Sequence, residues 1–229
     1  MKHPQNYGDE RQLLQCVFCG GPTQTVDHCP SKILLDEPYP EQLPTVPACQ
    51  PCNNSFSLDE EYLGCLVACV LAGSTAPDNI TRPKIRRILS SSPALRARID
   101  QQRNESANGI VFQPEMPRVE SVVTKLAKGH ALFELNESCL GEPDLIQIVP
   151  VELMTQEERQ NFELPDAPVG WPEVGSRAMQ RMLIVEEASL ASPWVVIQDG
   201  LYRYHAAAGS GISVQIMIAE YLACKVSWD

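Results

Sequence analysis

Residues 16–28 read C-V-F-C-G-G-P-T-Q-T-V-D-H, and residues 49–53 read C-Q-P-C-N. Each stretch contains a Cys-x-x-Cys pair, and 29 residues separate the two pairs. Two thiolates at this spacing can turn back onto one tetrahedral zinc ion, so two pairs complete a site with four cysteine ligands. The predicted ligands of this structural zinc are Cys16, Cys19, Cys49 and Cys52.

Two other interpretations of these cysteines are two disulfide bonds or four free thiols in a core. The N-terminal residues M-K-H-P-Q-N-Y-G-D-E are polar and do not resemble a secretory signal. A reducing cytosol disfavours disulfides, so we expect a cytoplasmic protein that binds zinc. Cys65 and Cys69 are four residues apart, a spacing that could suit a metal ion, but we expect both to be small buried side chains of a helix. The other three cysteines have no partner at metal-ligand spacing and are expected to be buried as well: Cys29, Cys139 and Cys224.

Asp27 and His28 lie between the cysteine pairs, and Asn53 follows the second pair directly. A zinc closed by four thiolates does no chemistry, so any reaction would belong to these neighbours. Carboxylate and amide oxygens are hard ligands suited to Mg²⁺ or Mn²⁺, and a neutral imidazole can take a proton from water. Together the three side chains suit hydrolysis of a phosphodiester with one catalytic metal ion.

The joint pattern C-x-x-C, V-D-H-x-P and C-x-x-C-N resembles the zinc-containing HNH endonucleases, also called ββα-metal or His-Me finger nucleases. The resemblance covers about residues 13–73. It implies that His28 is the general base that activates water. It also implies that Asp27 and Asn53 hold a catalytic Mg²⁺ or Mn²⁺, and that the four cysteines hold a structural zinc.

Two further functional classes stay open. Many members of the family carry Lys or His where this chain has Phe56 and Ser57. This departure, together with the acidic composition, favours a non-catalytic zinc module that binds nucleic acid or protein. The other class is a toxin or defence effector whose nuclease is silent until a partner acts.

The formal net charge of −11 is unusual for a nuclease, because cationic side chains drive most nucleic-acid binding. Residues 76–108 are the exception, since they carry seven basic and three acidic residues. We expect this segment to contact nucleic acid, with DNA as the expected substrate; a solvated helix face is the alternative. The predicted contact residues are Lys84, Arg86, Arg87, Arg96 and Arg98.

Local patterns predict most of the secondary structure. T-Q-T-V-D-H predicts a short strand, and the second cysteine pair is expected to open a helix that places Asn53 opposite His28. A capping-box pattern at Ser57–Glu60 predicts a helix to about Ala72. Two more helices are expected at about 81–89 and 92–103, each with a proline near its start.

The remainder of the chain predicts further strands and helices. Strands are expected at 110–112 and 145–149, and helices at 119–135 and 155–162, with Lys125, Lys128 and His130 on the polar side of the first helix. Residues 168–229 are expected to be β, with a hairpin at Asp199-Gly200 and His205 facing outward.

We therefore expect an α+β protein with three parts. Residues 1–75 would form an HNH module stapled by zinc, 76–108 a basic helical segment, and 109–229 a mixed domain that ends in an antiparallel β-meander. The longest apolar run is far too short to cross a membrane, which takes about 20 residues. Residues 109–229 could bind a regulatory protein or form a homodimer.

Overall fold

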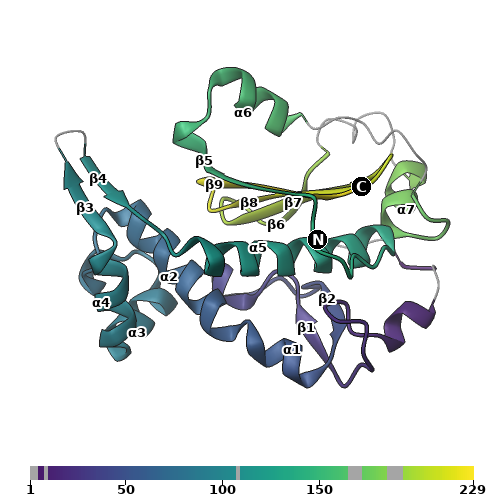
Figure 1. Cartoon of the computed structure of the whole chain (residues 1–229), viewed down its shortest axis with the longest axis horizontal. Helices are drawn as coiled ribbons and strands as arrows, with labels where there is room; N and C mark the ends of the chain where they lie inside the picture. Colours follow the sequence, from purple (N-terminus) through teal and green to yellow (C-terminus); the bar gives the residue numbers. More distant parts are fainter. Residues whose placement is uncertain (1–4, 8–9, 107–108, 165–171, 185–192) are drawn as a thin grey trace.

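The computed structural model describes residues 5–7, 10–106, 109–164, 172–184 and 193–229. Helices and antiparallel sheets are mixed along the chain (Figure 1), and the largest sheet is the five-stranded one at the C-terminus. The predicted α+β class is therefore confirmed.

A small hairpin and a short helix form the N-terminal part, which we call the hairpin module: β1 (Thr25–His28), β2 (Thr45–Ala48) and α1 (Gln50–Ser55). The predicted strand at β1 is confirmed. The sequence analysis did not predict β2, because it contains Pro47, which has no N–H to donate. A two-stranded sheet tolerates this residue, since one edge of every strand is unpaired.

The helix α2 (Ser57–Ala72) follows α1 almost without a break and ends at Gly73, whose φ of +60° lies in the left-handed region. The predicted span of this helix is confirmed, but the predicted capping box is wrong. Phe56 is the N-cap residue, and Ser57 Oγ donates to Asn54 O instead. The backbone at Phe56 stays helical, so no isolated N-terminus is left for a side chain to cap.

The basic segment folds onto the far end of α2. Its elements are α3 (Pro83–Ser91), α4 (Pro93–Gln101) and β3 (Arg103–Ser106), and β4 (Gly109–Phe112) follows directly. A proline begins each helix, as predicted. The helix α4 ends at Gln101, short of the expected 103, because the chain enters an antiparallel hairpin of β3 with β4.

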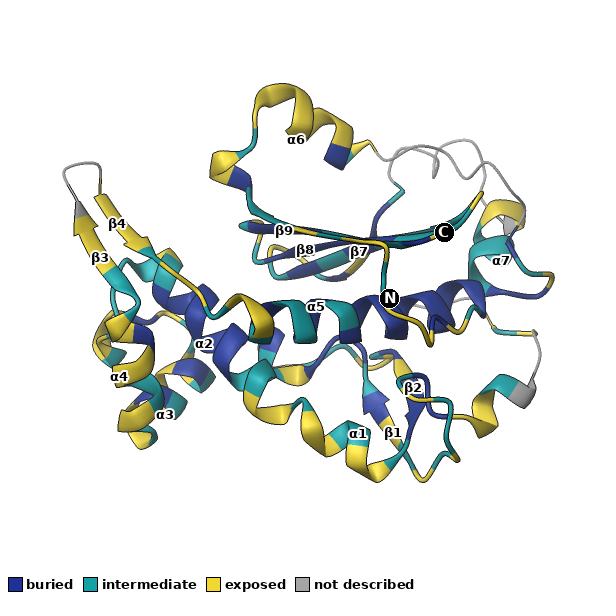
Figure 2. Cartoon of the chain, in the orientation of Figure 1, coloured by how far each residue is buried: buried dark blue, intermediate teal, exposed yellow. Residues whose placement is uncertain are grey.

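The helix α5 (Met116–His130), extended by a π-helical turn (Ala131–Leu135), runs between the hairpin module and the large sheet (Figure 1). It packs against α2 and against three strands of the sheet. Every residue from Lys125 to Asn136 is buried, as the dark stretch of α5 in Figure 2 illustrates. This part of α5 therefore has no solvent-facing side.

The expectation that Lys125, Lys128 and His130 face solvent is wrong, because all three are buried. His130 has an exposed fraction of 0% and shares a 2.8 Å hydrogen bond between its Nε2 and the hydroxyl of Tyr202. Its ring stacks on Tyr204 with centroids 3.7 Å apart. An amphipathic helix normally has one polar face, but here a layer of protein covers each side.

Five antiparallel strands form the C-terminal sheet in the order β5-β9-β8-β7-β6. They are β5 (Leu145–Pro150), β6 (Val195–Gln198), β7 (Tyr202–Ala208), β8 (Ile212–Ile218) and β9 (Leu222–Trp228). The predicted hairpins between consecutive strands from β6 to β9 are confirmed. The pairing of β5 with the last strand joins segments that are distant in the sequence, and no local pattern indicates it.

Two helices flank this sheet. The helix α6 (Gln156–Glu163) lies on the face opposite α5 (Figure 1) and begins with a capping box between Thr155 and Glu158. The second is α7 (Arg177–Ile184), which shows that the prediction of β structure throughout 168–229 is wrong. Residues 168–171 and 185–192 of that prediction lie outside the described residues.

One hydrophobic cluster extends from Val17, next to the first cysteine pair, to Trp228 at the end of the sheet. Side chains from all three predicted parts contribute to it, and the division at 75 and 108 stays a prediction. No helix in the described part of the chain combines the length and the apolar character needed to cross a membrane.

Gly129 lies where α5 approaches Cys29, the residue that follows β1 of the hairpin module. A Cβ atom at this position would lie 2.6 Å from Cys29 Sγ and 3.2 Å from Cys29 Cβ. We predict that Gly129→Val lowers the free energy of unfolding by about 2 kcal/mol, because overpacking forces these buried elements apart. Denaturant unfolding would measure the change.

Gly141→Val is the matched control, because no atom lies within 4 Å of a Cβ built there. Its free energy of unfolding should stay close to that of the wild type. If Gly129→Val and Gly141→Val are equally stable, α5 and Cys29 are not tightly packed at Gly129.

Candidate functional site

The four predicted zinc ligands converge in the structure. Each cysteine offers a sulfur, and all four sulfurs lie within 4.8 Å of one another. Cys19 Sγ and Cys49 Sγ are 3.7 Å apart. A tetrahedral ion with Zn–S bonds of about 2.3 Å holds its sulfurs about 3.8 Å apart. The cluster can therefore hold a zinc ion. None of the nine cysteines of the chain forms a disulfide bond.

Tight turns bring each pair of sulfurs together. In the first pair, Gly20 N donates to Cys16 O at 2.8 Å, and the φ of +72° at Gly20 favours glycine. In the second pair, Cys49 caps α1 and its sulfur accepts from Cys52 N. The helix that the second pair was predicted to open is thus present.

The first pair also provides a sulfur suited to metal binding. Burial acts to raise the pKa of Cys16, but backbone N–H groups, first among them that of Cys49, donate to its sulfur and lower the pKa to about 7. A thiolate is the form that binds zinc, and it is accessible here near neutral pH.

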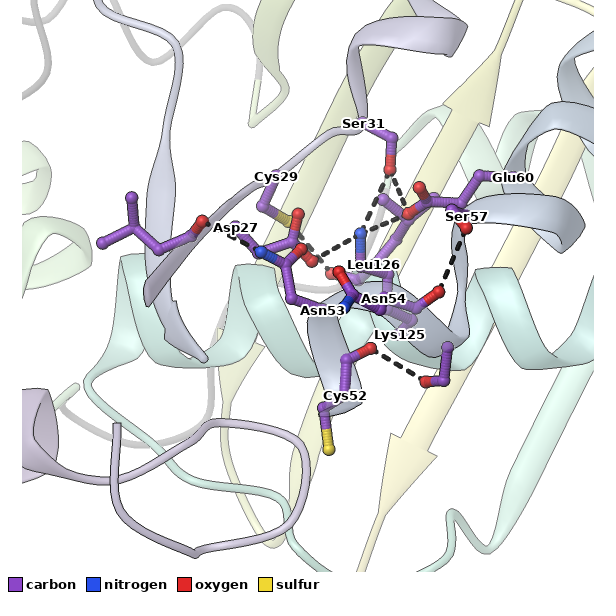
Figure 3. A network of polar contacts seen from close by, with 12 residues as sticks. Asp27, Cys29, Ser31, Cys52, Asn53, Asn54, Ser57, Glu60, Lys125 and Leu126 are labelled. Carbon is purple, nitrogen blue, oxygen red and sulfur yellow. Dashed lines mark hydrogen bonds and ion pairs between the residues drawn. The ribbon is translucent and has the colours of Figure 1, made fainter. Parts of the chain in front are cut away.

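The hairpin module brings Asn53 against the strand that carries Asp27 and His28. Asp27 lies opposite Val46 in the hairpin, and α1 packs against β1. Asn53 Nδ2 donates to Val26 O at 3.4 Å, and the dashed line from Asn53 in Figure 3 marks this contact. Residues from two cysteine-bearing segments thus meet at one place.

Asp27 is buried, with an exposed fraction of 9%, and its carboxylate faces α5. There it forms an ion pair with Lys125, whose Nζ lies 2.8 Å from Asp27 Oδ2. The same ammonium contacts Glu60 Oε1 and lies 3.2 Å from Ser31 Oγ, as the dashed lines in Figure 3 mark. We refer to Asp27, Ser31, Glu60 and Lys125 as the ammonium cluster.

The carboxylates keep this buried ammonium charged. Burial acts to lower the pKa of Lys125, but the facing charges of Glu60 and Asp27 more than offset that effect and raise the pKa above its ordinary value. Lys125 is therefore a permanent cation at neutral pH, placed directly against Asp27.

His28 is half-buried, and its Nδ1 atom is buried without a hydrogen-bond partner among the described residues. Burial lowers its pKa below the ordinary value, Lys32 and Lys125 act in the same direction, and Asp27 opposes them. The imidazole is therefore neutral at neutral pH, which is the form that can accept a proton.

The residues around Asp27 do not fit the Mg²⁺ or Mn²⁺ that the family resemblance implies. Asp27 and Asn53 have suitable oxygen atoms. However, the ammonium of Lys125 lies on the Asp27 carboxylate, and a divalent ion bound to the same group would be repelled by it. Lys125 therefore opposes the binding of a divalent ion at this carboxylate.

The predicted nucleic-acid contacts divide into two groups. Three of the side chains have partners within the protein: Lys84 with Lys32 O and Tyr39 OH, Arg86 with Ile80 O, and Arg98 with Glu115. The other two, Arg87 and Arg96, have no such partner among the described residues. The contacts of Lys84 bring the start of α3 beside the loop between β1 and β2.

The sequence analysis missed the ammonium cluster, although the sequence contains a signal for it. Lys125 lies three residues after Val122, so it shares the helix face that carries this apolar side chain. A lysine in such a position must reach solvent or find a buried partner. Its partners come from 65 and 94 residues away, so no local pattern could identify them.

Comparisons with known proteins do not identify a family for this chain. No protein-family model matches the chain, and no similar protein was found among the curated proteins or the solved structures. The interpretation of the site therefore depends on its geometry and on the sequence pattern.

We predict that Cys49→Ser removes the zinc and unfolds at least the hairpin module. A structural zinc contributes about 10–16 kcal/mol of binding free energy to folding, and a serine hydroxyl is a poor replacement for a thiolate. Metal analysis and thermal unfolding of the purified proteins would measure both effects.

Cys65→Ala is the matched control, since Cys65 is buried in α2 and lies outside the four-sulfur cluster. It should keep one zinc per chain. If Cys49→Ser also keeps one zinc and an unchanged unfolding temperature, Cys49 is not a ligand of a structural zinc.

Proposed function

We propose that this chain is an endonuclease of the HNH kind that hydrolyses phosphodiester bonds in nucleic acid, with DNA as the expected substrate. One observation carries the proposal: the contact of Asn53 Nδ2 with Val26 O, beside the four-cysteine cluster. It joins the two segments of the motif in a hairpin followed by a helix. This is the arrangement that the family resemblance implies.

In this proposal His28 is the general base. Its neutral imidazole would accept a proton from the water that attacks phosphorus. The hairpin fixes its backbone, and the cysteine cluster fixes the loops on both sides of the hairpin. Asp27 would not act as a second base, because the ammonium of Lys125 neutralises its charge.

The Mg²⁺ or Mn²⁺ expected on Asp27 and Asn53 is not part of this proposal, because the Asp27 carboxylate is paired with the ammonium of Lys125. The structural zinc is better supported, since the spacing of the four sulfurs suits it.

A non-catalytic zinc module is the second candidate. The ammonium cluster favours it, because Asp27 has a structural partner and is mostly removed from solvent. This alternative also agrees with the net charge of −11. It predicts that the protein binds zinc but cleaves neither plasmid nor single-stranded DNA.

We predict that His28→Ala lowers the rate of DNA cleavage by about 10²–10⁴-fold, the usual contribution of a general base. The variant should retain zinc and the wild-type unfolding temperature, because His28 is only half-buried. A plasmid-nicking assay at low salt, run with and without divalent ions, would measure the rate.

His205→Gln is the matched control. His205 lies in β7 of the C-terminal sheet and hydrogen bonds to Pro193 O, away from the hairpin module. It should cleave at the wild-type rate. Cleavage by His28→Ala at that same rate would exclude His28 as the base.

We predict that replacing both Arg87 and Arg96 with alanine weakens DNA binding at low salt. The slope of log K against log salt concentration should become shallower by about 2, because two phosphate contacts are lost. Arg159→Ala, an exposed arginine on α6, is the control and should leave the slope unchanged. An unchanged slope in the double variant would mean that α3 and α4 present only a solvated surface.

A further inference from the structure

The ammonium of Lys125 has the surroundings of a bound cation. Three side-chain oxygens face it, from Asp27 on β1, Ser31 in the following loop and Glu60 on α2 (Figure 3). Two of these oxygens belong to carboxylates, which are the ligands that hard divalent ions prefer. The site is built from three segments, so the fold and not local sequence creates it.

The side chain of Lys125 is held in this position by its partners. Its side chain is 2% exposed, and its ammonium donates to Ser31 Oγ and Glu60 Oε1 and forms an ion pair with Asp27. Because it is buried, Lys125 does not touch a nucleic acid in this arrangement. It acts through Asp27 and is therefore a positioning residue.

The ammonium already offsets part of the negative charge of this cluster. Asp27 and Glu60 contribute two negative charges and Lys125 one positive charge, so only −1 of the carboxylate charge is left to attract another cation. A divalent ion bound to Asp27 would share that carboxylate with the ammonium at 2.8 Å and would be repelled by it.

We propose that the Lys125 ammonium fills the cation position of this site, so that the wild-type chain binds no Mg²⁺ or Mn²⁺ at Asp27. Removing Lys125 then converts Asp27, Ser31 and Glu60 into a divalent-cation site. A consequence for catalysis, which rests on the proposed nuclease function, is that cleavage at His28 proceeds without added divalent ions.

Binding of Mn²⁺, followed by electron paramagnetic resonance, tests this directly. The proteins compared are the wild type, Asp27→Asn, Lys125→Arg, Lys125→Met and the double variant Lys125→Met/Asp27→Asn. Zinc content and circular dichroism establish that each is folded. Asp27→Asn corrects for Mn²⁺ held elsewhere on this acidic protein.

We expect one additional Mn²⁺ ion per chain in Lys125→Met only. That ion should disappear in the double variant, and Mn²⁺ should raise the unfolding temperature of Lys125→Met as its concentration increases. Lys125→Arg retains a positive charge and should behave like the wild type.

Two results would overturn the inference. Mn²⁺ binding by the wild type that is lost in Asp27→Asn would show that Lys125 does not exclude the ion; this comparison needs no Lys125 variant to fold. Absence of the additional ion from folded Lys125→Met would show that the three oxygens do not form a cation site.

Cleavage by the wild type in EDTA, with zinc measured afterwards to show that it is retained, separates this inference from the proposed function. Equal cleavage in EDTA and in Mg²⁺ supports both. Cleavage that requires Mg²⁺ overturns the inference and keeps the nuclease. No cleavage in either condition overturns the nuclease, and the Mn²⁺ measurements still decide the role of Lys125.

Discussion

The buried ion pair between Lys125 and Asp27 is the interaction on which the arrangement of this protein depends. An unpaired ammonium in a protein interior costs several kcal/mol, so the position of Lys125 is stable only where carboxylates meet it. Asp27 and Glu60 provide them at the surface of the hairpin module and of α2. Breaking such a pair from one side typically costs about 3–5 kcal/mol, which favours a single docking of α5 on the module.

The hairpin module depends on two supports. A two-stranded sheet with a short helix buries too little apolar surface to be stable alone. The cysteine cluster can supply one support through a zinc ion, which closes the loops before β1 and after β2. The helix α5 supplies the other, since Gly129 allows Cys29 to approach its backbone closely. The candidate catalytic residues therefore lie between a metal site and a buried helix, which restricts their motion.

On the side of α5 that faces the sheet, buried polar groups also have partners. His130 is fully buried, and it is accepted there because Tyr202 pairs with its Nε2 and Tyr204 stacks on its ring. Tyr204 in turn contacts Glu134, which pairs with Arg181 of α7. A chain of polar groups thus crosses the interface between α5 and the sheet, and its buried members, Tyr204 and Glu134, are hydrogen-bonded to each other.

Features governed by neighbouring residues were predictable from the sequence. The cysteine pairs, the helices that begin at Pro83 and Pro93, and the hairpins from β6 to β9 each depend on a few consecutive residues. The predictions failed where segments that are distant in the sequence pack against one another. Lys125 and His130 were expected on a polar face because a helix pattern does not reveal that both sides are covered.

By itself, the sequence determined the four zinc-ligand candidates, the α+β class and the short elements whose start signals are local. The tertiary structure decided that β5 joins β9, that α5 is buried from Lys125 onward, and that an ammonium lies against Asp27. The physical reason is the range of the interactions. Turn, cap and thiolate geometry act within a few residues, whereas the charge that Asp27 meets comes from a helix almost a hundred residues away and becomes its partner only when the layers pack.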